Sequence, residues 1–474
     1  MYDCIVIGGG IVGSAVLREL SKFNLRLLML EKEEDVACGC SKANSGIVHA
    51  GYDAVCNSLK AKFNVLGNKM YKALAEELGV PLINNGSLVL AKEDGLSGLQ
   101  TLLARGLLNG VEGLQILDRQ QLLLKEPNIA DCICYGLYAP SACIVSPYEM
   151  TIALAEQAVI NGAEVMFESE VTAVTRTNNG FKVTTNKGVY DCKVLINCAG
   201  YGADKINALA GGSKIDYLYT RGDYFILDSV ERKNYTHTCF PLPDQRGKGV
   251  LVSPTADGNV ILGPTSIAVS DGDDTAVSAS GLDYIKASVS EMLKNVNFRK
   301  SIRVFAGVRA SFGGDFVIEQ KDNLITLAGI CSPGLSSAPA IALHVAEVML
   351  PKTNIVMTKK PTFLPRLHRP LTRDMTKEEF SKLIESNPLY AKMVCRCERI
   401  TEGEIVDALN SPLKPSSLDA LKRRVRVGMG RCQGGFCTQR VMEIIARERK
   451  IPLRQVTKLG KGSEIILANI KEEL

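Results

Sequence analysis

The first 31 residues constrain the fold most, because they place a strand, a glycine-rich turn and a helix in a fixed order. Residues 2–7 are apolar and β-branched, and the segment 8–13, Gly-Gly-Gly-Ile-Val-Gly, follows directly. An amphipathic helix comes next, and an apolar strand over 25–30 ends at Glu31, 18 residues after Gly13. Such glycines let the backbone approach a pyrophosphate at the helix N-terminus, and the acid accepts hydrogen bonds from a ribose. The pattern predicts a Rossmann-like dinucleotide site with contacts at Gly8, Gly10, Gly13 and Glu31.

Four cysteines near the other end form a second signature. They stand as Cys395-Arg396-Cys397 and, after a helix-length interval, as Cys432 and Cys437 with four residues between them. Four thiolates in two short clamps suit an iron–sulfur cluster or a tetrahedral zinc ion. Structural zinc sites more often space paired ligands by two to four residues, which favours the cluster. A cluster in the tail of an enzyme-sized chain would carry single electrons.

The charge distribution excludes a nucleic-acid-binding stripe. The 474 residues hold 56 Lys and Arg against 51 Asp and Glu, and the surplus lies in residues 374–474, which carry 19 against 14. Basic residues between the cysteine pairs can offset cluster charge, meet an acidic redox partner or form a solvated helix face. These residues are Lys422, Arg423, Arg424, Arg426 and Arg431.

Cysteine usage and the start of the chain predict a reducing compartment. The sequence begins on its first strand, without a basic segment or cleavage site, and no apolar stretch reaches membrane-spanning length. We therefore expect a cytoplasmic protein, or one held at the inner face of the membrane by a partner, with its 15 cysteines buried or on metal. The pairs Cys38/Cys40 and Cys132/Cys134 lack a second clamp and are interpreted as structural.

Hydrophobic periodicity predicts that the dinucleotide domain is assembled from separated pieces of an α/β fold. Further helices are expected over 58–78, 146–161 and 340–350, and strands over 163–167, 181–185, 190–197 and 324–328. Strand-like segments between these pieces indicate a second, mixed β-sheet domain that covers the cofactor, with strands over 87–91, 223–227, 249–253 and 259–263.

The predicted domain boundaries follow from this alternation. The Rossmann-like domain comprises 1–83, 146–213 and 309–350, and the mixed-sheet substrate domain comprises 84–145 and 214–308. A proline-rich linker, 351–373, leads to a small helical domain, 374–474, called the tail below. The tail has so few apolar residues that we expect its folding to depend on its metal.

Segments spread along the first 350 residues carry a family resemblance. They are 43–53 (ANSGIVHAGYD), 58–62, 220–224, 247–253, 263–265, 305–309 and 332–335. Together they resemble the D-amino-acid-oxidase-like FAD oxidoreductases, and within them the glycerol-3-phosphate oxidases and dehydrogenases. The tail resembles the bacterioferritin-associated-ferredoxin-like [2Fe–2S] domain that closes the large flavin subunit of anaerobic glycerol-3-phosphate dehydrogenases. The oxidases stop near residue 350, so the tail argues against oxygen as the electron acceptor. The resemblance implies FAD, a [2Fe–2S] cluster and a redox partner, either a flavoprotein or a membrane-linked subunit.

The same resemblance implies a role for particular residues. His49 would be the general base that takes the proton of the substrate C2 hydroxyl as hydride leaves for flavin N5. Lys248 and Arg309 would clamp the substrate phosphate, and Ser332 would hydrogen-bond substrate or flavin. The implied flavin contacts are Gly8, Gly10, Gly13, Glu31, Ser41, Asn44, Ser45, Gly46, Val171, Ala199, Gly200, Gly334 and Leu335. The implied cluster ligands are Cys395, Cys397, Cys432 and Cys437.

Two alternatives remain at this point. L-2-hydroxyglutarate dehydrogenases share the stretch from Asn44 to Gly51, and subunits of opine or hydroxyproline dehydrogenases share the general plan, so another 2-hydroxy or amino acid is the second substrate class. The other alternative is that the protein is a flavin and iron–sulfur electron-transfer subunit without catalysis. A relay needs neither a base nor an anion clamp, so His49, Lys248 and Arg309 argue against it.

Overall fold

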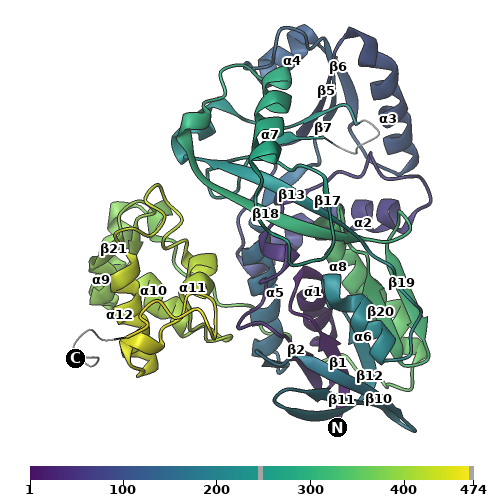
Figure 1. The fold of residues 1–474 in the computed structure, drawn as a ribbon, viewed down its shortest axis with the longest axis vertical. Coiled ribbons are helices and arrows are strands. Elements are labelled where there is room, and N and C mark those ends of the chain that lie inside the picture. The colour runs from purple at the N-terminus through teal and green to yellow at the C-terminus, as the bar shows by residue number, and fades with distance from the viewer. Residues whose placement is uncertain (244–248, 469–474) are drawn as a thin grey trace.

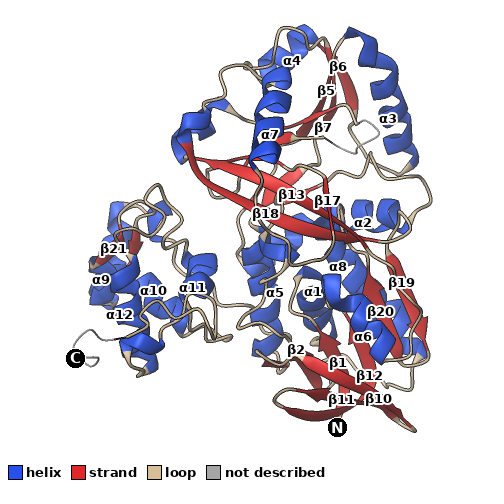
Figure 2. Ribbon diagram, in the orientation of Figure 1, coloured by secondary structure: helices blue, strands red, loops and turns tan. Residues whose placement is uncertain are grey.

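The computed structural model describes residues 1–243 and 249–468. Two sheet-based halves form a body of residues 1–350, and the tail forms a separate helical lobe against one side of it (Figures 1 and 2). The body therefore carries the two predicted sheets, and the tail carries the predicted helices.

The first sheet gathers strands from distant parts of the chain. Its parallel strands are β9 (Glu164–Met166), β2 (Leu27–Leu30), β1 (Tyr2–Ile7), β12 (Gly188–Asn197) and β20 (Leu324–Ala328). Three antiparallel strands extend it, namely β10 (Val171–Thr177), β11 (Gly180–Thr185) and β19 (Val317–Lys321). Helix α6 (Ala203–Leu209) follows β12. The predicted hairpin return through 181–197 is confirmed as β11 and β12, which pair antiparallel.

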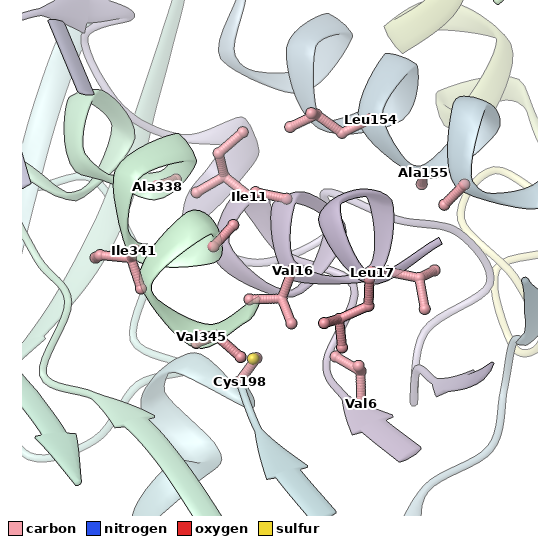
Figure 3. Close-up of a cluster of buried hydrophobic side chains, with 14 of the residues drawn as sticks. Val6, Ile11, Val16, Leu17, Leu154, Ala155, Cys198, Ala338, Ile341 and Val345 are labelled. Atoms are coloured by element: carbon pink, nitrogen blue, oxygen red, sulfur yellow. The ribbon is translucent and has the colours of Figure 1, made fainter. Parts of the chain in front are cut away.

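Helix α1 (Ile11–Leu20) is the centre of the body rather than an amphipathic surface helix. Helix α5 (Pro147–Ile160) and helix α8 (Gly334–His344) pack against it (Figure 3). Even Arg18 and Glu19 are buried. The predicted helix is confirmed, but it has almost no face exposed to solvent, because two helices from later in the sequence cover it. Helix α2 (Leu59–Leu78) lies in the predicted range 58–78, and Ser58 is its N-cap. It packs in turn on α8.

Helix α8 begins at Gly334, six residues before the predicted start at Ala340. Pro339 lies inside it, and proline lacks the N–H that would bond to the carbonyl of Leu335. The Tyr71 hydroxyl of α2 donates to that carbonyl instead, at 2.6 Å. A side chain distant in sequence thus satisfies the group that the proline leaves open, and the helix continues through a π-helical turn, Val345–Met349.

The second sheet is mixed, as predicted, and stands above the first in Figure 2. Its strands in spatial order are β17 (Ile267–Val269), β13 (Leu218–Leu227), β16 (Val260–Gly263), β15 (Leu251–Pro254), β14 (Thr238–Pro241), β5 (Ser87–Ala91), β7 (Tyr135–Ala139) and β6 (Gln115–Asp118). Strand β18 (Ser301–Ser311) pairs with β13 along its length. This strand therefore continues across the predicted domain boundary between residues 308 and 309. Helices α3 (Leu96–Leu108), α4 (Arg119–Lys125) and α7 (Ala279–Met292) flank the sheet. A small sheet of β3 (Ile47–Val48), β8 (Cys143–Val145) and β4 (Leu82–Ile83) contributes to the body.

The tail has a core of its own. It contains α9 (Lys377–Ser386), the hairpin β21 (Met393–Cys395) and β22 (Ile400–Thr401), α10 (Glu402–Leu409), α11 (Leu418–Val425) and α12 (Thr438–Arg449). The predicted linker is held against the body, because buried Arg366 bonds to Glu156 at 2.7 Å and to the Leu78 carbonyl at 2.8 Å. In the described ranges, no helix combines the length and the apolar character needed to cross a membrane.

Candidate functional site

The predicted dinucleotide residues meet at the carboxyl ends of β1, β2 and β12. Gly8 has a φ of +103°, and a Cβ there would lie 2.5 Å from the carbonyl oxygen of Cys198. A Cβ at Gly13 would lie 2.0 Å from the Gly8 carbonyl oxygen, so both positions require glycine. Ala199 and Gly200 follow β12 beside this turn. Val171 begins β10 and packs against the hydrophobic cluster that contains Ile7 and Leu30. The backbone therefore offers an open cradle at the N-terminus of α1, as phosphate binding demands.

Glu31 stands at the end of β2 as predicted. Its carboxylate accepts hydrogen bonds from the N–H groups of Gly9 at 2.5 Å and Glu33 at 2.9 Å. Burial raises the pKa of Glu31, although these two donors act against that shift. On the other side of the turn, the Ser41 hydroxyl accepts the N–H of Ile11 at 2.8 Å, which ties the 40–46 segment to α1.

A cavity of about 610 Å³ lies beyond Ser41, where the two halves of the body meet. Its volume is in the range of cofactor and substrate pockets. The predicted residues that line it come from three separate segments: Ser41, Asn44, Ser45, His49, Arg309, Ser332, Gly334 and Leu335. Gly46 lines a neighbouring cavity, and Lys248 lies outside the described residues.

The backbone of His49 is fixed at three points. Its N–H donates to the Ser336 hydroxyl at 2.7 Å, and its carbonyl accepts from the side-chain amides of Asn64 at 3.0 Å and Asn68 at 3.2 Å. The His49 ring lies 5.9 Å from the ring of Phe240. Sequence reasoning missed these supporting residues, and the only available signal was asparagine, a poor helix former, twice in the middle of α2.

Arg309 projects from β18 toward the same cavity. One Nη of its guanidinium donates to the Thr265 carbonyl at 2.9 Å, which leaves further donors of the fork for a ligand. Tyr224 was not predicted as a site residue, yet it also lines the cavity. Its ring stacks on Phe305 with centroids 4.7 Å apart, and its hydroxyl lies 3.4 Å from Ser45 Oγ.

In the tail, the four predicted cysteines form two pairs across the two clamps. The sulfur atoms of Cys397 and Cys432 are 3.7 Å apart, and Cys437 hydrogen-bonds to Cys395. That bond, helped by the N–H groups of Gly428 and Glu398, lowers the pKa of Cys395 to about 6 and favours a thiolate. Within the described part of the chain, no three His, Cys, Asp or Glu side chains are arranged to hold one metal ion. Two thiol pairs fit a two-iron cluster, in which each iron takes two cysteines.

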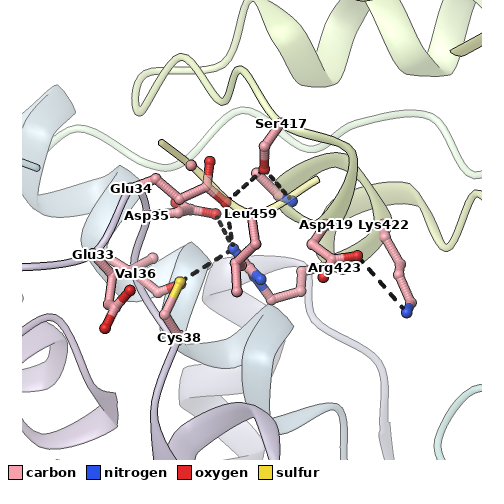
Figure 4. Close-up of polar contacts among 12 residues, drawn as sticks. Glu33, Glu34, Asp35, Val36, Cys38, Ser417, Asp419, Lys422, Arg423 and Leu459 are labelled. Atoms are coloured by element: carbon pink, nitrogen blue, oxygen red, sulfur yellow. Dashed lines mark hydrogen bonds and ion pairs between the residues drawn. The ribbon is translucent and has the colours of Figure 1, made fainter. Parts of the chain in front are cut away.

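The basic run between the cysteine pairs joins the tail to the body (Figure 4). Arg423 donates to Asp35 of the body at 3.0 Å. Arg424 makes two further bonds to Asp35, at 2.6 and 2.8 Å. Burial disfavours the charged form of Asp35, but the two guanidinium groups hold its pKa below its usual value. The solvated-face alternative is therefore wrong for Arg423 and Arg424, which are buried.

A second set of contacts connects the cysteine loops to the body. Arg426 bonds to Glu398, next to Cys397, at 2.8 Å and reaches Asp257 of the body at 2.8 Å. Gln433, next to Cys432, accepts a hydrogen bond from Arg303 at 3.1 Å. Arg303 lies on β18, the strand that carries Arg309 into the cavity of about 610 Å³, which is called the flavin-side cavity below.

A second cavity, of about 630 Å³, lies between tail and body. It is lined by tail residues such as Lys422, Met429 and Gln433 and by body residues 42–46. The two cavities share the wall residues Cys40, Ala43, Asn44, Ser45, Gly307 and Val308. A thin layer of the 40–45 segment and β18 thus separates the predicted flavin site from the side on which the tail docks.

Comparison with known proteins agrees with this division. Residues 3–348 match the family described as FAD dependent oxidoreductase, and residues 393–447 match the BFD-like [2Fe-2S] binding domain. A glycerol 3-phosphate dehydrogenase of Caloramator mitchellensis is 42% identical over 482 residues, covering 100% of both chains. A glycerol 3-phosphate oxidase of Mycoplasma genitalium is 32% identical and covers 77% of this chain and 97% of its own. The solved structure of L-alpha-glycerophosphate oxidase from Mycoplasma pneumoniae with FAD bound has a TM-score of 0.73 and 29% identity, covering 78% of this chain and 99% of its own.

Proposed function

Because this chain belongs to the FAD dependent oxidoreductase family and ends in a BFD-like [2Fe-2S] binding domain, we propose that it is a glycerol-3-phosphate dehydrogenase. It oxidises the C2 hydroxyl of the substrate and delivers the electrons to a redox partner by way of the tail. The observation that supports this function best is the convergence of His49, Arg309 and Ser332 on one cavity. The full-length similarity to a glycerol 3-phosphate dehydrogenase supports the choice of substrate.

His49 acts as the base in this proposal. The neutral imidazole removes the proton from the substrate hydroxyl while the carbon-bound hydrogen leaves as hydride. FAD, when bound, supplies the hydride acceptor. The hydrogen bonds that the His49 backbone makes with Ser336, Asn64 and Asn68 fix the point of the chain from which the ring projects into the cavity.

Arg309 binds the substrate phosphate. Its planar fork can donate two parallel hydrogen bonds to phosphate oxygens, and the Thr265 carbonyl holds it in place. Ser332, which precedes α8, donates to the substrate or to the flavin. Lys248 is proposed as the second phosphate ligand on the resemblance alone.

The cysteines of the tail hold the [2Fe–2S] cluster, whose chemistry is one-electron transfer. Arg423, Arg424 and Arg426 keep this domain against the wall of the flavin-side cavity. A protein with such an outlet does not need oxygen as the acceptor, so the partner is a flavoprotein, an electron carrier or a membrane-linked subunit.

Anaerobic stopped-flow spectroscopy of the purified FAD-loaded protein tests the substrate. Bleaching of the flavin by glycerol 3-phosphate alone supports the proposal. Bleaching by L-2-hydroxyglutarate instead supports the alternative of an L-2-hydroxyglutarate dehydrogenase, the class that shares the 44–51 segment. If neither compound reduces the flavin, the chain is an electron-transfer subunit and the catalytic roles given to His49 and Arg309 are wrong.

A further inference from the structure

The tail presents an exposed face around its cluster ligands, opposite in character to the buried face that docks on the body. Cys397 is exposed, and Phe436, inside the Cys432–Cys437 clamp, has 91% of its surface exposed. Met393, two residues before Cys395, is 49% exposed. An aromatic side chain that stands free in a ligand loop contributes nothing to the core, so its exposure needs another explanation.

The exposed charges on this face are positive, although Lys392 lies close enough to Glu402 to help lower the pKa of that carboxyl. Lys392, Arg396 and Arg399 are exposed, and none of the three forms an ion pair with another described residue. The nearby carboxylates are already neutralised, since Glu398 pairs with Arg426, and Glu402 pairs with Arg440 and Arg447. Because Cys397 contacts Cys432 and Cys395 contacts Cys437, Arg396 and Phe436 lie on loops that meet at the thiols.

We propose that this face, defined as Lys392, Met393, Arg396, Arg399 and Phe436, docks an acidic electron-carrier protein. The inference rests on the proposed function of the tail as the electron outlet, and it names the surface and the charge of the partner. Unpaired cations steer an acidic protein to the cluster and orient it, and Phe436 supplies the apolar anchor at the centre.

The electron balance fixes the stoichiometry of docking. One substrate molecule loses two electrons and two protons as its alcohol becomes a ketone. The carrier is the oxidant and takes one electron at each encounter with the one-electron cluster, so two carrier molecules are reduced and two protons go to solvent. Each carrier must therefore leave quickly, which suits an electrostatic interface with a small apolar centre.

Binding of a purified acidic flavodoxin to the oxidised, substrate-free holoprotein tests the docking face. Affinity is measured at ionic strengths of about 10 and 150 mM, where the Debye length is about 30 and 8 Å. The double variant Arg396→Glu/Arg399→Glu should bind at least tenfold more weakly at the lower ionic strength and lose most of its salt dependence. Phe436→Ala should bind about tenfold more weakly at both.

The matched control variants carry the same kinds of substitution, a double charge reversal and a truncation to alanine, on the surface of the body. Lys72→Glu/Lys182→Glu reverses two exposed cations of α2 and β11, and Leu124→Ala truncates a side chain that is 88% exposed on α4. Both should bind flavodoxin like the parent protein. Visible absorption and circular dichroism must show that each variant retains its cluster. If the double variant loses the cluster, the single variant Arg399→Glu replaces it, because Arg399 lies outside both cysteine clamps.

The outcomes separate this inference from the proposed function. Absence of flavodoxin binding at low ionic strength, or unchanged affinity in cluster-loaded variants, overturns the docking face. Binding to anionic phospholipid vesicles through Phe436, without flavodoxin binding, makes the face a membrane contact and also overturns it. Flavin reduction by glycerol 3-phosphate is measured without the carrier, so its failure overturns the proposed function and leaves the docking result standing.

Discussion

Replacing Asp35 with Asn should loosen the tail from the body. Asp35 is fully buried and accepts three hydrogen bonds from Arg423 and Arg424. Its loss leaves the two buried guanidinium groups with only longer contacts to carboxylates, Arg423 to Glu34 at 3.7 Å and Arg424 to Glu156 at 4.0 Å. Removing one partner of a buried ion pair costs about 3–5 kcal/mol. Asn retains one acceptor oxygen, so about 3 kcal/mol is expected, which shifts the docking equilibrium roughly a hundredfold.

Hydrogen exchange measures this shift directly. The backbone amides of α11 and of residues 33–38 should lose protection together, because they form the two sides of the contact, while β1 and β12 in the body stay protected. Glu112→Gln is the control, since Glu112 is 84% exposed and its one ion pair among the described residues is with Lys69. That change should cost no more than about 1 kcal/mol. Unchanged exchange on both sides in Asp35→Asn would mean that the arginines do not hold the tail.

The pH dependence of docking follows from the same pair. The folded-state pKa of Asp35 is lowered, so its stabilising contribution is present above the unfolded pKa of about 3.9 and is lost as the pH falls through the lower folded value. The contribution of Asp35 to docking should therefore be insensitive to pH from neutrality down to about 4 in the parent protein. Loss of α11 protection near neutral pH would contradict this assignment.

Three further predictions concern the site and the cluster. His49→Asn should keep FAD yet slow anaerobic flavin reduction roughly a hundredfold or more, the usual contribution of a positioned base, and near-normal reduction would remove His49 from the mechanism. Arg309→Lys retains the charge but not the fork, so substrate titrations should show weaker binding with FAD affinity unchanged; earlier loss of flavin would contradict the role. Cys432→Ser should lose the cluster, which in the parent protein is about two irons and two acid-labile sulfides per chain, and should increase exchange in the tail while substrate still reduces the flavin. Cys132→Ser, at an exposed thiol outside both clamps, is its control, and one zinc without sulfide in the parent protein would refute the electron outlet.

Much of the local structure follows from sequence patterns. The opening strand, turn and helix, the helix expected over 58–78 and the hairpin of β11 and β12 all depend on neighbours within about 20 residues, and each is confirmed. The four cysteines stand in two short clamps, and the short spacing within each clamp limits how far apart its two cysteines can lie. The contacts between the clamps come from the tertiary structure. Composition and spacing therefore determined the α/β body, the helical tail and the chemistry that each can support.

Long-range contacts decided the rest, because residues far apart in sequence supply them. A hydroxyl from α2 satisfies the Leu335 carbonyl of α8, and the burial of α1 depends on helices more than 120 residues away. The arginines of the tail look like a solvated face until Asp35 and Asp257 are brought opposite them. The site itself exists only where segments around His49, Arg309 and Ser332 converge. Sequence periodicity reports which side of an element is apolar, whereas the partner that covers that side is chosen by the packing of the whole chain.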